Sequence, residues 1–368
     1  MNFQMVFNQT VKFSVKKILF FTQGPFENAS SRVRVYQFLP GLESYGYQCQ
    51  VLPALPEKEF HRYYLDSTFL GKCSFFGKMG LERIKHLFQL GGYDIIFLQR
   101  EIFPCLPPFF EKIISLKAKK VVFDFDDAIF FSKRKPWLSG FQEFKIRRIM
   151  GWSDLVLAGN ETLASFALDS HSNVHLLPSA VDTRRYVPLD KQVKSSELVI
   201  VWMGSPSTLH YLEEIRPVLE ELSRETPFQL RVIGACPSSD WGMGAKFIPW
   251  DWKTEVQYLQ TSDVGIMPLK DGLWERGKCG YKLLQYMACG LPVVASPVGV
   301  NQEIVEEGVN GFLAKDEKEW KKKLILLLKD ASLRKKLGEA GRKTVEERYS
   351  LEQVFSCLLN LLNNLIES

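Results

Sequence analysis

Short apolar runs alternate with longer amphipathic stretches along most of the chain. The runs are rich in β-branched and aromatic residues, as in KILFFT at 17–22 and KVVFDF at 120–125. Between them, apolar residues recur at the three- and four-residue spacing of helices that bury one face. This alternation is typical of parallel α/β layers. In the first half we expect strands at 17–22, 48–52, 93–99, 120–125, 155–158 and 174–177, and helices at 31–45, 79–90 and 137–150.

The same pattern begins again at residue 198. Strands are expected at 198–203, 229–233, 264–267 and 292–295, and helices at 209–225, 253–261 and 281–289. Residues 188–196, PLDKQVKSS, carry proline and charge without periodicity and indicate a domain boundary. The length of 368 residues also favours two domains. We therefore predict two doubly wound α/β domains, followed by an amphipathic helix at 351–366 that must pack on another element.

Composition excludes several classes of protein. The hydrophobic share of 46% and charged share of 24% are those of a globular protein. No apolar run approaches the roughly 20 residues that span a bilayer, and the start has no signal-peptide apolar block. The seven cysteines form no Cys-x-x-Cys pair, so we interpret them as reduced thiols. A soluble cytoplasmic protein is expected.

Charge and phenylalanine are unevenly distributed. Residues 1–185 carry 24 Lys and Arg against 17 Asp and Glu, and 23 of the 27 Phe. Cations gain free energy near acidic headgroups, and aromatic rings favour the membrane interface. This favours peripheral contact with an anionic membrane at its cytoplasmic face, notably through residues 61–88; no nucleic-acid partner is expected. An ordinary Phe-rich core with a solvated basic surface is the alternative.

The segment 274–300 carries the richest set of chemical groups. Gly277 and Gly280 lead into the expected helix at 281–289, with Arg276 and Lys278 beside them. Exposed backbone N–H groups and the helix dipole favour anions, so this segment is a candidate diphosphate cradle. A surface turn with solvated charges is the alternative.

Two further loops follow predicted strands, where ligands of open α/β sheets bind. The segment 204–208, GSPST, offers hydroxyls and N–H groups to a phosphate, although helix capping alone would explain it. The loop 23–34 offers candidate acceptor or phosphate contacts from Gly24, Ser31 and Arg32. Neither G-x-G-x-x-G nor G-x-x-x-x-G-K-[ST] occurs, which disfavours a dehydrogenase or a kinase.

The segment 124–127, DFDD, places carboxylates at a strand end. We favour Asp126 or Asp127 as the group that orients an acceptor or acts as base, with helix capping as the alternative. The five histidines show no metal spacing, so no metal site is expected, and the absence of G-x-S-x-G disfavours an α/β-hydrolase.

Several motifs occur in the order found in glycosyltransferase family 4, the group 1 glycosyl transferases. Those in the second half resemble the family's donor domain: LVIVWMGSPSTLHYL at 198–212, SDVGIMPL at 262–269, GYKLLQYMACGLPVVAS at 280–296, and SPVGVNQEIVEEGVNGFL at 296–313. In the first half, SDLVLAGNET at 153–162 and LLPSAVDTRRYVP at 176–188 resemble the end of its acceptor domain. The resemblance implies the GT-B fold, in which two facing Rossmann-like domains enclose a cleft. It also implies an acceptor domain of residues 1–187 plus about 347–368, and a donor domain of 188–346.

The chain departs from the family at two glutamates spaced eight apart, where it has Gly277 and Gln285. Gln285 could still hydrogen-bond ribose hydroxyls, and Lys278 and Cys279 would take over contacts of the first glutamate. Ser179 and Ala180 replace the usual Asn-Gly. The chain thus resembles a branch with a W-x-R-G-K-C-G-x-K-L-L-Q-Y-M-A variant.

The resemblance implies a retaining glycosyltransferase that uses a nucleotide diphosphate sugar and no metal or other cofactor. Its acceptor would be a saccharide or a lipid-linked saccharide in cell-surface polysaccharide or glycoconjugate synthesis. Lys278 and Arg276 would stabilise the leaving diphosphate, and Asp127 or Asp126 would orient the acceptor. The donor would contact Gly204, Ser205, Ser207, Thr208, Trp250, Gly280, Lys282 and Gln285. A noncatalytic sugar-nucleotide or glycan-binding subunit is the alternative, and a GT-B epimerase is disfavoured because no acid/base pair can be assigned.

Overall fold

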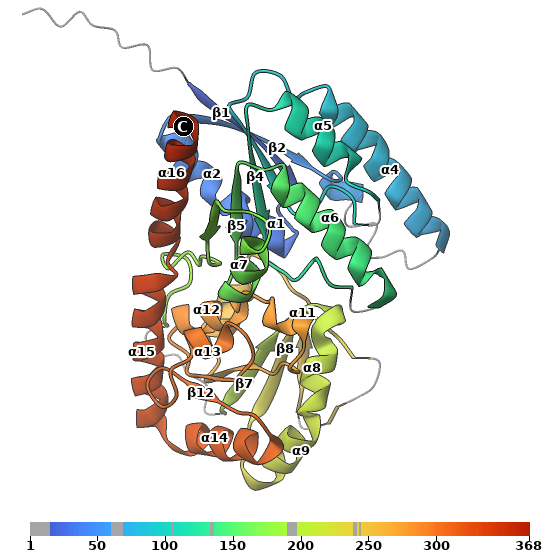
Figure 1. Cartoon of the computed structure of the whole chain (residues 1–368). Helices are drawn as coiled ribbons and strands as arrows, with labels where there is room; N and C mark the ends of the chain where they lie inside the picture. Colours follow the sequence, from blue (N-terminus) through green and yellow to red (C-terminus); the bar gives the residue numbers. More distant parts are fainter. Residues whose placement is uncertain are drawn as a thin grey trace, which may run out of the picture.

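Two parallel β-sheets, each flanked by helices, make up the chain (Figure 1). The computed structural model describes residues 15–59, 69–104, 106–132, 136–189, 197–237, 241–242 and 244–368. The strand orders are β2-β1-β3-β4-β5-β6 and β12-β11-β10-β7-β8-β9, and every described strand pair is parallel. This arrangement confirms the predicted α/β class with two Rossmann-like units.

The first sheet forms from the apolar runs of the first half. Its centre is buried on both faces, as continuous apolar sequences require, because helices cover both sides. Its strands are β1 (Lys16–Thr22), β2 (Tyr47–Pro53), β3 (Ile95–Gln99), β4 (Lys120–Phe125), β5 (Leu155–Ala158) and β6 (Val174–Leu176).

The helices of the first domain differ from the prediction at 31–45 and at 79–90, where the helix instead spans Phe69–Leu87. No helix was predicted at Phe109–Lys117 or Glu161–Leu168. The stretch 31–45 is three short pieces. The first ends at Arg34, and the last begins at Leu39 beside Pro40, which has no N–H to donate and whose ring disfavours continuation of the preceding turn. The helices are α1 (Ala29–Arg34), η1 (Tyr36–Phe38), α2 (Leu39–Ser44), α4 (Phe69–Leu87), α5 (Phe109–Lys117), η2 (Pro136–Leu138), α6 (Ser139–Gly151) and α7 (Glu161–Leu168).

The second sheet has the strands β7 (Val199–Met203), β8 (Gln229–Ile233), β9 (Lys246–Ile248), β10 (Val264–Met267), β11 (Val293–Ala295) and β12 (Phe312–Leu313). The helix expected at 209–225 is divided in two, with Pro217 in the first turn of the second piece. The helices are η4 (Pro206–Thr208), α8 (Leu209–Glu214), α9 (Arg216–Glu225), α10 (Glu255–Gln260), α11 (Leu273–Arg276), α12 (Tyr281–Ala288), α13 (Asn301–Ile304), α14 (Glu317–Lys329) and α15 (Ala331–Arg348).

The last helix, α16 (Leu351–Glu367), returns to the first domain, whereas α15 runs along the second (Figure 1). Val354, Leu358, Leu362 and other residues of its apolar face join the core around β1 and β3. Asn363 accepts hydrogen bonds from Lys16 Nζ at 2.8 Å and from Tyr47 OH at 2.7 Å. The end of the chain is therefore part of the first domain's core.

Replacing Leu362 by Ala tests this docking. Leu362 is fully buried, so its truncation leaves a cavity and should lower the free energy of unfolding by about 2–4 kcal/mol. Asn364→Ala, on the exposed side of the same helix, should change it by less than about 0.5 kcal/mol. Thermal unfolding followed by circular dichroism measures both; equal effects would contradict the docking.

Candidate active site

The two domains meet where the loops after β4 and β5 contact the segment between α11 and α12. Cys279 Sγ donates to Asp126 O at 3.2 Å. Asn160, which caps α7, donates from its amide to Lys278 O at 2.9 Å and to Arg276 O at 3.2 Å. The predicted diphosphate segment thus lies against the first domain.

Glycine allows this close approach. A Cβ on Gly277 would lie 2.6 Å from Ala128 Cβ of the first domain. Gly280 has a φ of +66°, a backbone conformation that other residues seldom adopt, and it forms the N-cap of α12. In this arrangement, no larger side chain fits at position 277 without moving the domains apart.

Lys278 and Lys282 lie on either side of the start of α12. Lys278 Nζ is 3.6 Å from Asp127 Oδ1 and 5.5 Å from the centre of the Trp274 ring. Lys282 Nζ is 4.7 Å from the Trp202 ring. Burial, together with the nearby charge of Lys278, lowers the pKa of Lys282 to about 7. Within the described ranges, no carboxylate pairs with Lys282.

Arg276 binds a carboxylate of its own domain and does not pair with Asp126 or Asp127 in the described structure. Its Nε and Nη2 bind Asp271 at 2.7 and 3.0 Å, and its side chain is 56% exposed. Of the two predicted catalytic cations, the structure brings only Lys278 to the carboxylates of the first domain.

Asp126 and Asp127 converge on Arg100, a residue that the sequence analysis missed. Arg100 Nε is 3.2 Å from Asp126 Oδ1, and its Nη2 binds Asp127. Ser30 Oγ donates to Asp126 Oδ2 at 2.6 Å. Burial alone would lower the pKa of Arg100, but the two aspartates reverse the effect and raise it, so the group is a fixed cation.

The predicted loop 23–34 divides into structural and interface residues. Ser31 is fully buried; its Oγ accepts from Gly24 N at 3.1 Å and donates to Gln99 Oε1 at 2.9 Å. The guanidinium of Arg32 lies 4.7 Å from the Trp250 ring and 4.8 Å from the Trp252 ring of the second domain. Gly24 and Ser31 therefore hold the loop, and Arg32 joins the domains.

The segment 204–208 forms an exposed turn after β7. Ser205 Oγ and Ser207 Oγ are 2.8 Å apart, and Thr208 Oγ1 donates to Ser205 O at 2.9 Å. Neither Ser205 nor Thr208 caps a helix through its side chain. Gly204 is required, since a Cβ there would lie 2.4 Å from the Trp202 ring.

Gln285 belongs to a buried hydrogen-bond network. It donates to Tyr186 OH at 2.8 Å, and Tyr186 OH donates to Glu255 Oε1 at 2.5 Å. Trp250 Nε1 donates to Glu255 Oε2 at 2.6 Å. The side chain of Gln285 is only 2% exposed, so its predicted ribose contact needs access that this arrangement does not give. No motif in the sequence indicated Glu255.

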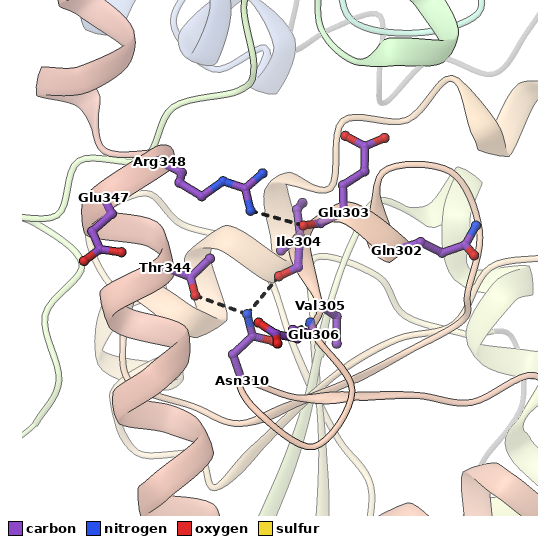
Figure 2. Close-up of a pocket in the computed structure, with 9 residues that line it drawn as sticks. All are labelled: Gln302, Glu303, Ile304, Val305, Glu306, Asn310, Thr344, Glu347 and Arg348. Carbon is purple, nitrogen blue, oxygen red and sulfur yellow. Dashed lines mark hydrogen bonds between the residues drawn. The ribbon is translucent and has the colours of Figure 1, made fainter.

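A hollow of about 400 Å³ lies between α13 and α15 (Figure 2). Asn310 closes its floor, donating to Ile304 O at 3.0 Å and to Thr344 Oγ1 at 3.2 Å. In the part of the chain that the structure describes, no group of three or more His, Cys, Asp or Glu could hold a metal ion.

Comparison with known proteins assigns the second domain. Residues 197–330 match the family model described as "Glycosyl transferases group 1". The N-acetyl-alpha-D-glucosaminyl L-malate synthase of Bacillus anthracis is 35% identical over 103 residues, which are 27% of this chain and 26% of that protein. A GDP-mannose-dependent monoacylated alpha-(1-6)-phosphatidylinositol monomannoside mannosyltransferase of Corynebacterium glutamicum is 25% identical over 228 residues, 54% of this chain and 58% of that protein.

Solved structures are similar over almost the whole chain. Sucrose-phosphate synthase from Thermosynechococcus elongatus has a TM-score of 0.72 at 14% identity, covering 96% of this chain and 99% of that one. Anabaena HepE in complex with UDP and glucose has a TM-score of 0.69 at 14% identity, covering 95% and 100%. By sequence, residues 197–330 are therefore similar to the group 1 glycosyl transferases, and by structure both domains together form a GT-B fold.

Proposed function

We propose that this chain is a retaining glycosyltransferase that moves a sugar from a nucleotide diphosphate sugar to a saccharide or lipid-linked saccharide. The observation that carries the proposal is the pair Lys278 and Lys282 at the N-terminus of α12, for which the described residues supply one ion pair, between Lys278 and Asp127. A half-buried pair of amines with too little negative charge is a site for an anion, and the helix dipole adds to the attraction.

A diphosphate would supply the missing charge. As the bond between the sugar and the diphosphate breaks, negative charge grows on the leaving phosphate oxygens, and Lys278 and Lys282 stabilise it. Because these cations are already in place, little reorganisation is needed. Complexes of Anabaena HepE with UDP support a donor of this class.

Asp127 and Asp126 would serve the acceptor. They follow β4 in the first domain, opposite the lysines, so an acceptor hydroxyl bound by Asp127 would lie near the sugar carbon. In the same-face route, the departing phosphate can take the hydroxyl proton, and Asp127 then needs only to orient the acceptor.

A noncatalytic sugar-nucleotide or glycan-binding subunit is the second candidate. The close packing of Gly277 on Ala128 and the burial of Gln285 favour it, because the two positions that resemble the family's glutamates are closed to a ligand in this arrangement. The two candidates differ in turnover, not in nucleotide binding.

We also propose that the first domain docks on an anionic membrane to reach a lipid-linked acceptor. Large apolar side chains are exposed on and beside α4, α5 and α6, which lie together on one side of that domain (Figure 1): Phe76, Leu81, Ile84, Phe88, Phe109, Ile113, Leu116, Trp137 and Phe144. Apart from the buried Arg83, Lys145 and Glu111, the sequences of the three helices contain seven Lys or Arg and two Glu. Apolar side chains among cations suit acidic lipid headgroups.

Two further observations bear on this docking. The Corynebacterium relative is named for a phosphatidylinositol mannoside acceptor, which is a lipid. Among the described residues, no helix combines the length and the apolar character needed to cross a bilayer. The exposed side chains on and beside α4, α5 and α6 support peripheral contact of this face with a membrane surface.

Lys278→Ala tests the diphosphate site. Loss of the charge-assisted contact should weaken binding of a nucleoside diphosphate by roughly 10- to 100-fold. A thermal-shift panel of UDP, GDP, ADP, TDP and CMP on both proteins measures it, since a ligand that binds only the native state raises the melting temperature. Stabilisation of both proteins alike, or of neither, would contradict the assignment. A parent that binds a nucleotide but turns over no nucleotide sugar would be a binding subunit.

Lys282→Met tests, without any ligand, whether the positive charge of Lys282 lacks a compensating negative charge. The pKa of Lys282 falls from about 10.5 unfolded to about 7 folded, so the buried cation destabilises the fold fully below pH 7 and not above pH 10.5. The variant should therefore melt several degrees higher than the parent at pH 6, and the gain should fade as the pH rises toward 10. The exposed Lys322→Met serves as control; a gain independent of pH would refute the idea.

The membrane proposal predicts cosedimentation with phosphatidylglycerol vesicles and not with phosphatidylcholine vesicles. Replacing Leu81, Phe88 and Leu116 together by Ser should reduce the bound fraction at least severalfold, because these side chains are 62%, 86% and 72% exposed. The matched triple replacement of Leu168, Val309 and Leu326 by Ser, all exposed elsewhere, should bind like the parent. No preference for the anionic vesicles would refute the docking.

A further inference from the structure

Asp127 contacts two cations, one from each domain. Arg100 belongs to the same domain and binds one carboxylate oxygen, Oδ2. Lys278 belongs to the other domain and approaches the second oxygen, Oδ1, at 3.6 Å. The carboxylate that we assign to the acceptor is thus already shared with a residue that we assign to the donor.

Arg100 is the fixed partner. Its φ of +64° lies in the left-handed region, which costs a residue with a Cβ about 1 kcal/mol or more and persists only where surrounding contacts impose it. Those contacts are visible: its N–H donates to Asp124 O at 2.7 Å, and its guanidinium binds Asp126 and Asp127. Arg100 therefore positions both carboxylates whether or not a ligand is bound.

Lys278 is the exchangeable partner. Its ion pair with Asp127 is at 3.6 Å, longer than a close ion pair, and joins side chains that are 20% and 23% exposed. Gly277 precedes Lys278, and Lys282 adds a second cation nearby without a carboxylate of its own in the described structure. A diphosphate, with two or more negative charges against one, would attract Lys278 more strongly than Asp127 does.

We propose that the Lys278–Asp127 ion pair masks the acceptor carboxylate until a diphosphate takes Lys278, so that the donor binds before the acceptor. The inference rests on the proposed function and adds an order of binding to it. When the diphosphate arrives, Lys278 moves to the phosphate oxygens, Asp127 keeps its bond to Arg100, and Oδ1 becomes free to accept the hydrogen bond of an acceptor hydroxyl. An acceptor that arrives first meets an occupied carboxylate.

The order predicts an unusual gain of affinity. In Asp127→Asn, Lys278 loses its competing partner, and inorganic pyrophosphate and UDP should bind roughly two- to fivefold more tightly, the range expected for a partly exposed ion pair. Calorimetry on the full chain at low salt measures both probes. A structural defect would instead weaken binding.

A double-mutant cycle separates the ion pair from a general change of charge. In the Lys278→Ala background, Asp127→Asn should give no further gain, because the contact is already lost. Asp126→Asn removes the same charge without touching Lys278, so any gain that it gives should be smaller and should persist in that background.

The outcomes distinguish this inference from the proposed function. If pyrophosphate and UDP bind the parent and Asp127→Asn with equal affinity, the masking is overturned while the diphosphate site stands. Equal gains from Asp127→Asn and Asp126→Asn in both backgrounds would also overturn it. If neither probe binds either protein, the proposed function fails and the inference fails with it.

Discussion

The close approach of the two domains at Gly277 and Cys279 is the constraint on which the rest of the site depends. Without a Cβ at position 277, the backbone reaches Ala128, and Cys279 then reaches the carbonyl of Asp126. This contact brings Lys278 to Asp127 and presents the N-terminus of α12 to the first domain. A glutamate side chain at position 277 would require a wider separation of the two domains. The glycine that departs from the family pattern is therefore also what allows Lys278 to approach Asp127.

The fold was largely predictable because its signals are local. Buried parallel strands are continuous apolar runs, and the runs at 17–22, 120–125 and 229–233 became β1, β4 and β8 with ends shifted by no more than a residue. The prediction was wrong where a proline interrupts an otherwise helical pattern, as at Pro40 and Pro217. Periodicity records which face is buried but does not show where the backbone breaks.

The candidate site was predictable only in part, because its geometry comes from contacts between distant segments. Glycines and lysines in 274–282 indicated an anion site from their own neighbours in sequence. Arg100 was missed because its role depends on a backbone conformation and on two aspartates 26 and 27 residues away. Arg32 was predicted to contact the acceptor or a phosphate. Its guanidinium lies 4.7 Å and 4.8 Å from two indole rings of the other domain, a pairing that no local pattern encodes.

The return of the chain into the first domain has a mechanical consequence. Where the chain crosses back before α16, Tyr349 and Leu351 form hydrogen bonds of 2.9 Å with Val181, which precedes the outward crossing. The two chain segments that connect the domains thus run side by side and are joined by backbone hydrogen bonds, so they act together as one hinge. A hinge of this kind resists twisting and sliding of one domain relative to the other, and it permits rotation of the domains about one axis. Any opening of the interface would then be a rotation, smallest beside this hinge and largest at the groups farthest from it.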